Sequence, residues 1–179
     1  MKKISVIALL LVLCTCLTVF SGCAKKEADS APDGMKLASG ENADYCMYVP
    51  DTWKVDRSDL YTIAFFSSGD TTSISTTAYA IGTDIATLED WWGIFEGRMD
   101  KELFSEHSDV TVSDAVLGGV EGKEYSFTAK RGEQDYNVVI TAVIKDFNVY
   151  YVTYMSVPKY NEDHLEERAQ IIEAFKFKS

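Results

Sequence analysis

Histidine and proline are scarce in this sequence, which has two histidines and three prolines among 179 residues. His107 stands in "SEHSD" and His164 in "NEDHLEE", each beside acidic residues. A Ser-His-Asp hydrolase would have to use one of them, but the sequence has no G-x-S-x-G nucleophile motif. We therefore expect both histidines to be solvated surface residues, and we predict no catalytic residue.

Motifs for metal ions and phosphate groups are also missing. The sequence has no EF-hand spacing, no paired-cysteine zinc site and no His-Glu-x-x-His helix. The glycines of "LGGVEGKEY" are not followed by Gly-Lys-Ser/Thr, so we interpret them as turn residues. Four acids near the C-terminus are Glu162, Asp163, Glu166 and Glu167. They could bind calcium weakly, but a solvated helix face explains them better, so we predict no metal site and no cofactor.

Basic residues are outnumbered, with 17 Lys and Arg against 28 Asp and Glu and a net charge of −11 at pH 7. Nucleic acids and anionic lipid surfaces attract clusters of Lys and Arg. A chain this acidic is a poor candidate for binding either of them. We predict no nucleic-acid partner.

Cysteine is almost absent from the part of the chain that we expect to fold. Cys14 and Cys16 lie inside an apolar leader, and Cys23 follows it. Cys46 is left alone in the alternating run "DYCMYVP", and a single thiol cannot form an internal disulfide. We interpret Cys46 as buried and inert, with a reactive or intermolecular thiol as the alternative.

Residues 1–22 have the layout of an export signal, because two lysines precede a continuous apolar run that ends in small residues. The alternative is an uncleaved membrane helix. The run from Ile4 to Phe20 is at the short end of the roughly 17 to 25 residues that span a bilayer. We therefore predict a cleaved signal peptide.

The segment "FSGC" at residues 20–23 resembles the lipobox of bacterial lipoproteins, although Phe20 stands where leucine is usual. The resemblance implies that a peptidase cuts before Cys23 and that the Cys23 sulfur carries a diacylglyceryl group, often with a further acyl chain such as palmitate on the amino group. Two or three acyl chains hold a protein stably on a membrane. The implied location is the extracytoplasmic face of the cell membrane. The alternative is an ordinary signal followed by a chance cysteine.

Residues 23–36 are predicted to be the lipidated cysteine and a flexible tether. The segment "AKKEADSAPDG" is small, charged and punctuated by proline and glycine, without apolar periodicity. Residues 37–179 remain as a single globular domain.

Short alternating runs of β-branched and aromatic residues predict strands in this domain. They are "DYCMYVP", "YTIAFFS" and "TSISTTAYAIG", then "DVTVSDAVL", "KEYSFTAKR", "YNVVITAVI" and "NVYYVTYMSV". Both faces of "YNVVITAVI" are apolar, so we expect a central strand that is covered on both sides. Trp53 is expected to fold back onto the sheet. The turn "KDFN" lacks the glycine of a tight hairpin, which makes Phe147 unusual there.

The run "ATLEDWWGIFEGRMDKELF" has an apolar period of about 3.6 and predicts a helix that Thr87 caps, with Asp90 completing a capping box. Its apolar residues share one stripe, which assigns the tryptophans to the core rather than to an aromatic binding box. The predicted stripe is Leu88, Trp91, Trp92, Phe95, Met99 and Leu103.

A second helix is predicted in "NEDHLEERAQIIEAF", with Asn161 as its cap. Its predicted core-facing residues are Leu165, Ala169 and Ile172. The final "FKFKS" is predicted to be a short strand with Phe175 and Phe177 facing inward.

This order of strands, helix, four strands, helix and final strand resembles the PsbP-like family, of the PsbP/DcrB type. The resemblance rests on "YVPDTW", "GGVEGKEYSF" and "VYYVTYMSVPKY", followed by a helix and "FKF". It implies an α+β fold, in which an antiparallel sheet of about six to eight strands is layered with two main helices as an α/β/α sandwich. It also implies a scaffold for binding and assembly, and it carries no site residue to this chain.

The expected function is that of a non-enzymatic binding or assembly module of the bacterial cell envelope, with lipid at Cys23 as its membrane contact. No motif specifies a ligand or a protein partner. The alternative is an envelope enzyme, or an accessory to one, with an acidic cleft near His107 or His164. A transporter's substrate-binding lipoprotein would have two lobes around a cleft, and this chain is too short for that.

Overall fold

The computed structural model describes residues 30–57 and 61–178. The predicted signal peptide and Cys23 lie outside these residues. The described strands are β1 (Met35–Leu37), β2 (Tyr45–Cys46), β3 (Tyr48–Pro50), β4 (Lys54–Arg57), β5 (Tyr61–Phe65), β6 (Ser73–Ala80), β7 (Glu106–His107), β8 (Thr111–Leu117), β9 (Val120–Arg131), β10 (Gln134–Lys145), β11 (Asn148–Ser156) and β12 (Lys176–Phe177). The described helices are α2 (Leu88–Glu102) and α3 (Leu165–Ala174), with the 3₁₀ turns η1 (Pro158–Tyr160) and η2 (Glu162–His164) before α3. None of the helices in this part of the chain is long and apolar enough to cross a membrane.

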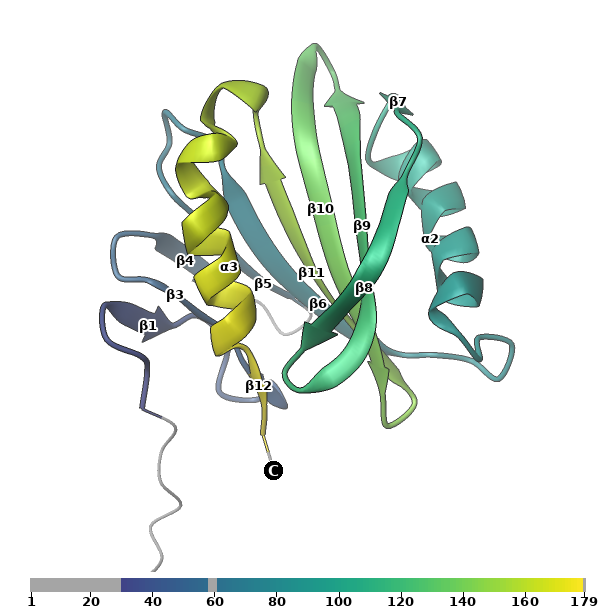
Figure 1. The fold of residues 1–179 in the computed structure, drawn as a ribbon, viewed down its shortest axis with the longest axis horizontal. Helices are drawn as coiled ribbons and strands as arrows, with labels where there is room; N and C mark the ends of the chain where they lie inside the picture. The colour runs from purple at the N-terminus through teal and green to yellow at the C-terminus, as the bar shows by residue number, and fades with distance from the viewer. Residues whose placement is uncertain (1–29, 58–60, 179) are drawn as a thin grey trace, which may run out of the picture. The chain divides into compact units, whose positions relative to one another are not determined.

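An antiparallel sheet organises the fold. Among the described residues, eight strands form this sheet in the order β4-β5-β6-β11-β10-β9-β7, with β8 also paired to β9. Two small strand pairs, β1 with β3 and β12 with β2, lie outside it. Helices α2 and α3 are layered on the sheet near its opposite ends (Figure 1). The predicted α+β class is thereby confirmed, and β1 begins two residues before the predicted domain boundary.

The sheet separates two hydrophobic cores. On β10, Ile140 packs in the core that holds α2, whereas Val143 packs in the core that holds α3. Odd spacing along a strand places side chains on opposite faces, so the two cores lie on the two sides of the sheet. Ile140 and Val143 are almost fully buried. The predicted central strand with cover on both sides is therefore confirmed.

Helix α2 begins as predicted. The Thr87 hydroxyl accepts a hydrogen bond from the Asp90 N–H at 3.1 Å, and the Asp90 carboxylate accepts one from the Thr87 N–H at 2.9 Å. These bonds satisfy N–H groups that have no partner inside the helix. The predicted stripe is correct except at its end. Leu103 is 46% exposed, because the helix stops at residue 102 and the following Phe104 turns into the core instead.

Helix α3 differs from the prediction. The segment after Pro158 first makes the two 3₁₀ turns, so Asn161 is not a side-chain cap and the α-helix starts at Leu165. Leu165 is 44% exposed, while Ile171 and Phe175 are buried. A shift of one residue along a helix rotates the buried face by about 100°. The predicted stripe of Leu165, Ala169 and Ile172 was therefore wrong in phase, although Ile172 does reach the edge of the core.

The hairpin of β8 and β9 curls over its neighbour. Its two-residue turn is Gly118–Gly119, and both residues have a positive φ, of 58° and 79°. Further along β9, a Cβ on Gly122 would lie 2.1 Å from the Ala142 carbonyl oxygen. A glycine is therefore needed for the close approach of β9 to β10 at this point. This approach sets the course of β8, which passes in front of the sheet in Figure 1.

The turn between β10 and β11 is strained, as the lack of a glycine in "KDFN" indicates. Asp146 and Phe147 both have a positive φ, of 50° and 60°. Such a two-residue hairpin favours Asn-Gly because side chains other than glycine rarely adopt this conformation. The Phe147 side chain is 86% exposed and gains no core packing in return.

Candidate binding groove

A concave groove lies between the first turn of α2 and the β8–β9 hairpin. Its volume is about 780 Å³. Its wall contains the N-cap Thr87 and the helix residues Leu88, Glu89 and Trp92, and the β8–β9 hairpin contributes the rest. The groove exists because the curled hairpin stands away from the helix N-terminus, while the capping box fixes the position of that terminus.

Two stacked aromatic rings form the floor of the groove. The Trp92 and Tyr125 rings are parallel within 5°, with centroids 4.0 Å apart. The Tyr125 hydroxyl donates a hydrogen bond to the Leu88 carbonyl oxygen at 3.2 Å. Burial raises the pKa of this hydroxyl to about 12, and the nearby Glu89 carboxylate adds to the rise. Tyr125 is therefore a neutral group that ties β9 to α2, and the floor is rigid.

The rim of the groove is acidic. Its charged residues are Glu89, Asp114, Glu121 and Lys123. The Lys123 ammonium donates a hydrogen bond to the Asp114 carboxylate at 2.5 Å and thereby lowers the pKa of that carboxyl. Lys123 therefore balances one of the three carboxylates, and two remain without a cation from the rim.

An apolar shoulder borders this rim. Val112 and Val116 on β8 are 52% and 56% exposed. Cross-strand pairing sets Val112 opposite Tyr125 and Val116 opposite Glu121, so both valines share the face of the groove. Val116 also lines an adjoining hollow of about 520 Å³ with Asp114 and Glu121.

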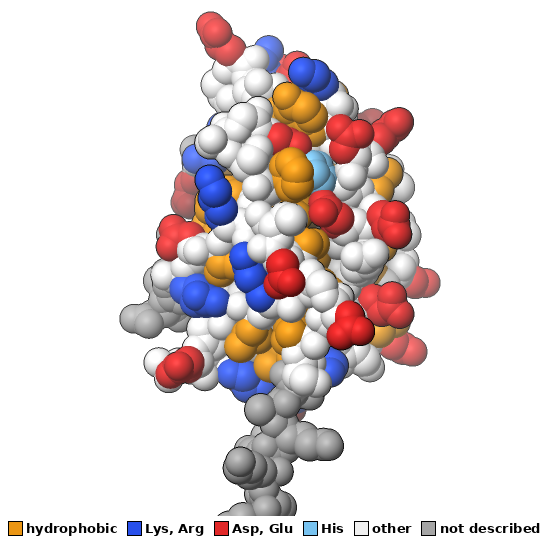
Figure 2. Space-filling view, turned by 90° about the vertical axis from the view of Figure 1, so that its left-hand side faces the viewer, with side chains coloured by type: hydrophobic (Ala, Val, Ile, Leu, Met, Phe, Trp, Pro, Cys, Tyr) orange, Lys and Arg blue, Asp and Glu red, His pale blue; other side chains and the backbone are white. Residues whose placement is uncertain are grey.

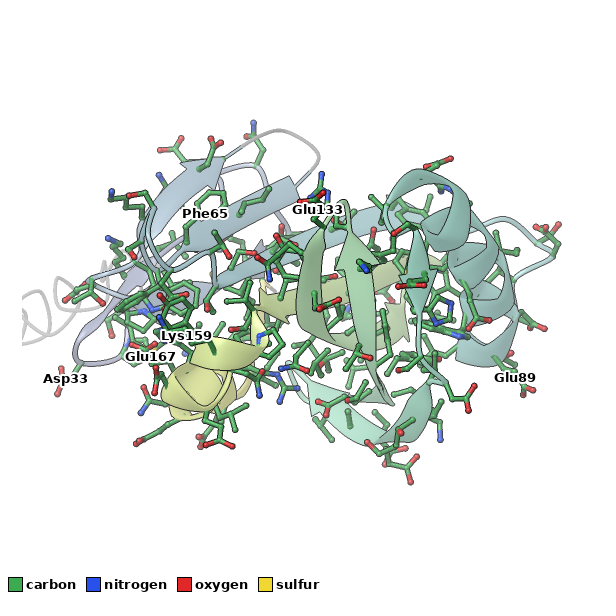
Figure 3. The ribbon with its side chains drawn as sticks, turned by 90° about the horizontal axis from the view of Figure 1, so that it is seen from above. Asp33, Phe65, Glu89, Glu133, Lys159 and Glu167 are labelled. Carbon is green, nitrogen blue, oxygen red and sulfur yellow. The ribbon has the colours of Figure 1, made fainter. Side chains whose placement is uncertain are left out.

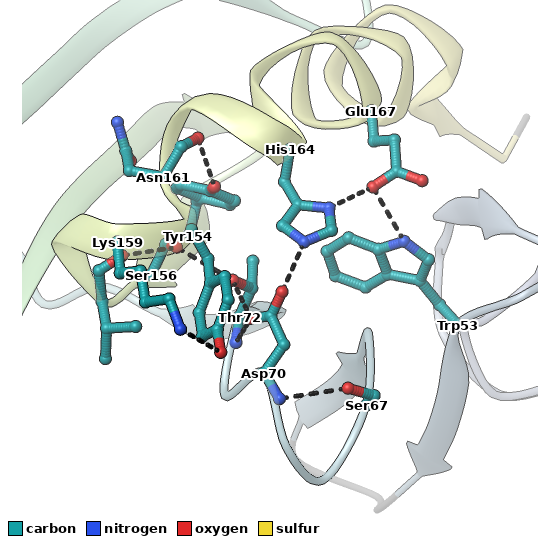
Figure 4. Close-up of polar contacts among 12 residues, drawn as sticks. Trp53, Ser67, Asp70, Thr72, Tyr154, Ser156, Lys159, Asn161, His164 and Glu167 are labelled. Atoms are coloured by element: carbon teal, nitrogen blue, oxygen red, sulfur yellow. Dashed lines mark hydrogen bonds and ion pairs between the residues drawn. The ribbon is translucent and has the colours of Figure 1, made fainter.

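The polar cluster around His164 is the second candidate. The Nε2 atom of His164 lies 2.7 Å from an Asp70 carboxylate oxygen, and its Nδ1 atom lies 2.5 Å from a Glu167 carboxylate oxygen (Figure 4). The same Glu167 oxygen accepts a hydrogen bond from the Trp53 indole at 3.2 Å. Asp70 also accepts two bonds from Thr72, from its N–H and its hydroxyl. The prediction of a solvated His164 was wrong, since its side chain is 5% exposed.

This arrangement suits a structural cross-link. Burial alone would lower the pKa of His164, but the hydrogen bonds to Glu167 and Asp70 outweigh it and raise that pKa above its ordinary value of 6.5. A general base needs a free ring nitrogen, and both nitrogens of His164 face carboxylates. The cluster instead joins the β5–β6 connection, the start of α3 and Trp53. Trp53 is fully buried, as predicted.

The remaining predicted residues are dispersed. His107 is half-buried, and its Nδ1 atom lies 2.6 Å from the Ser108 carbonyl oxygen. Cys46 is buried, as predicted. Among the described residues, no group of three or more His, Cys, Asp or Glu is placed to hold a metal ion.

Three of the four C-terminal acids lie on the solvated face that we predicted for them, namely Glu162, Asp163 and Glu166. Glu167 differs, because it turns inward to His164 and Trp53. On the face shown in Figure 2, acidic side chains gather along one side, with most of the lysines and arginines on the other. Figure 3 places Glu167 and the groove residue Glu89 at opposite ends of the molecule.

Sequence reasoning missed the groove because its walls come from separate segments. It assigned Trp92 to the core, which is correct, since Trp92 is 9% exposed. The one available signal was the pattern of β8, where exposed valines alternate with an acid in "VSDAV". In a strand, this spacing places the two valines and the acid together on one face.

Comparisons with solved structures identify the fold. The cyanobacterial PsbP protein CyanoP from Synechocystis sp. PCC 6803 superposes with a TM-score of 0.62 at 8% identity, over 83% of this chain and 95% of that one. Mog1p, a Ran-binding protein of Saccharomyces cerevisiae, gives 0.58 at 9% identity, over 83% and 96%. LpqN of Mycobacterium tuberculosis, which is involved in cell envelope biogenesis, gives 0.55 at 13% identity, over 81% and 91%.

No protein-family model and no curated protein sequence matches this chain. At these low identities the structural likeness concerns the fold alone. The described part of the chain therefore has a PsbP-like fold, as the resemblance to the PsbP-like family implied.

Proposed function

We propose that this protein is a non-catalytic binding module of the cell envelope, held at the extracytoplasmic face of the membrane by lipid on Cys23. The groove between α2 and the β8–β9 hairpin is its binding site. The PsbP-like fold supports this proposal, since its structural neighbours include a Ran-binding protein and a protein of envelope biogenesis. The lipobox-like "FSGC" supports the anchor.

The observation that carries the proposal is the composition of the groove. It combines a rigid aromatic floor, an apolar shoulder and a charged rim, which is how binding sites obtain both affinity and orientation. Histidine and cysteine are absent from its described lining, and the hydroxyl of Thr87 is engaged with Asp90 in the capping box. These residues recognise a partner through contact and charge.

The rival function, an envelope enzyme with an acidic cleft, receives little support from the surroundings of His164. Two carboxylates do gather around this histidine, but they enclose it and occupy both ring nitrogens. A substrate would have to break the cross-link of α3 to reach the imidazole. Binding at the groove requires no such rearrangement.

Site-specific photocrosslinking in intact cells tests the proposal. A p-benzoylphenylalanine in place of Val112 lies on the groove face, and one in place of Leu165 lies on the exposed side of α3. We expect discrete adducts from the Val112 position that the Leu165 position does not give. Adducts of equal pattern at both positions, or none at Val112, would contradict the groove as the binding site.

A further inference from the structure

One edge of strand β8 is open. In the described part of the chain, β8 pairs with β9 and with no other strand. The two-residue turn at Gly118–Gly119 makes Leu117 and Val120 a hydrogen-bonded pair, and such pairs alternate along an antiparallel ladder. The backbone N–H and C=O groups of Val112, Asp114 and Val116 therefore point away from β9, toward the open edge.

The side chains of the same three residues lie on the groove face. Their partners across the ladder are Tyr125, Lys123 and Glu121, and these also line the groove. A strand added along β8 would therefore continue the sheet and place every second side chain beside the groove. The order apolar, acidic, apolar along β8 sets the complementary order of its partner as apolar, basic, apolar.

The negative charge of the groove rim indicates which kind of strand can bind along this edge. Glu89 and Glu121 lie on the rim without a cation from the rim, and the chain carries a net charge of −11. Lys or Arg side chains on the added strand would neutralise these carboxylates. A second copy of the same chain would instead bring its own Asp114 and Glu121 toward them, and like charges on neighbouring strands are destabilising.

We propose that the open edge of β8 binds an extended, basic segment of a partner protein as an added β-strand, with Lys or Arg side chains of that segment reaching the groove. This inference rests on the proposed function because it uses the same groove. It adds the conformation of the partner, its backbone pairing and its charge.

Defined peptides test the inference without knowledge of the natural partner. The probe is a fluorescein-labelled peptide of about nine residues, long enough to run along β8. Valine and lysine take turns at every second position, with threonine between them, so that the side chains on the groove face read Val, Lys, Val. Binding is measured by fluorescence anisotropy with the full chain, produced in a bacterial host and purified in detergent. We expect a glutamate-for-lysine peptide, and a peptide N-methylated at alternate amides, each to bind at least about tenfold more weakly.

A charge-reversed protein provides the second arm. The double variant Glu89→Lys/Glu121→Lys should weaken binding of the lysine peptide about tenfold, and added salt should reduce the difference. The matched control is Glu162→Lys/Glu166→Lys at the start of α3, which has the same net charge, lies on an exposed face away from β8, and should change the affinity less than about twofold. Circular dichroism and urea midpoints establish that both variants are folded.

Several outcomes would overturn the inference. Equal affinity for the N-methylated peptide would exclude strand addition. An equal loss of affinity for the lysine peptide in both double variants would show that net charge alone causes the effect. Concentration-dependent dimerisation that Val116→Lys abolishes would make a second copy the occupant. Groove-specific crosslinks in cells without any peptide binding would leave the proposed function standing and remove this inference, whereas the absence of both would remove the two together.

Discussion

The His164 ring donates a hydrogen bond to the Asp70 carboxylate at 2.7 Å, although 94 residues separate the two in the chain. This contact joins the connection between β5 and β6 to the turn that precedes α3. Thr72 holds Asp70 in place, and its hydroxyl lies 2.8 Å from that of Ser156 at the end of β11. One buried polar network therefore fastens three distant segments.

The stability of this network should depend on pH through His164. Because the folded pKa of His164 is raised above 6.5, the imidazolium contributes stability that is complete below pH 6.5 and is lost as pH rises through the folded value. We expect His164→Gln to be destabilised by about 3 kcal/mol at pH 6. The nearest cation on α3, Arg168, is paired with Glu124 and does not replace the imidazolium.

Urea unfolding of the native protein and of His164→Gln between pH 6 and pH 9 measures this effect. The difference between their free energies of unfolding should shrink toward alkaline pH. A difference that stays constant over this range would show that folding does not change the pKa of His164, and a difference that grows with pH would show that the folded ring is neutral.

Asp70 should contribute to the loss of folding stability at acid pH. Burial opposes ionisation of this carboxyl, but hydrogen bonds from Thr72 and His164 prevail and lower its pKa below 3.8. Its contribution to stability is therefore present above pH 3.8 and is lost as pH falls through the lower folded value. The Asp70→Asn variant should lack this component, so its stability should change less than that of the native protein in urea titrations from pH 5 to pH 2.

Gly122 should resist substitution. A Cβ at this position meets the backbone of β10, so Gly122→Ala should cost about 2 kcal/mol by forcing the two strands apart. Gly97 on the exposed face of α2 is the control, since a Cβ there meets nothing within 4 Å. Gly97→Ala should stabilise the protein by about 0.5 to 1 kcal/mol. Equal effects of the two substitutions in urea unfolding would contradict the close approach.

Phe147→Gly should stabilise the protein. The substitution relieves a positive φ in the β10–β11 turn at little cost in packing, for a gain of about 1 kcal/mol. Phe147→Ala keeps the Cβ and should leave the melting temperature nearly unchanged. If calorimetry shows the two variants to be equally stable, backbone strain is not the property that distinguishes this turn.

Cys23→Ala should accumulate as an unprocessed precursor in cell fractions, because the lipobox-like segment implies cleavage only after its cysteine is lipidated. The control is Cys46→Ala, which removes a buried thiol and should leave both processing and lipidation intact. Mass spectrometry separates precursor, lipidated and released forms. A Cys23→Ala protein of normal mature length in the medium would refute the anchor.

The sequence was sufficient for elements whose signal is local. The period of 3.6 located α2 with its cap at Thr87, and alternation located the meander of β8 to β11. The buried stripe of α3 was misplaced by one residue and the start of the helix by three. Pro158 begins 3₁₀ turns, which change the phase before the α-helix starts at Leu165. Nothing near His164 in the sequence indicates Asp70 as its partner, so its burial could not be predicted.

The groove could not be predicted for a related reason. Its floor pairs Trp92 with Tyr125, and its shape depends on the close approach of β9 to β10 at Gly122. Apolar periodicity predicts which residues are buried, but it does not predict where a gap remains between two packed elements.

The sheet also divides the tryptophans between its two sides. Trp53 lies in the α3 core, 5.8 Å from the His164 ring, whereas Trp91 and Trp92 lie in the α2 core beneath the groove. Single-tryptophan proteins would thus carry a natural optical reporter in either layer. The emission of Trp53 would follow protonation of the neighbouring imidazole, and that of Trp92 would follow occupancy of the groove. Events at the two ends of the molecule could then be timed against each other without any added dye.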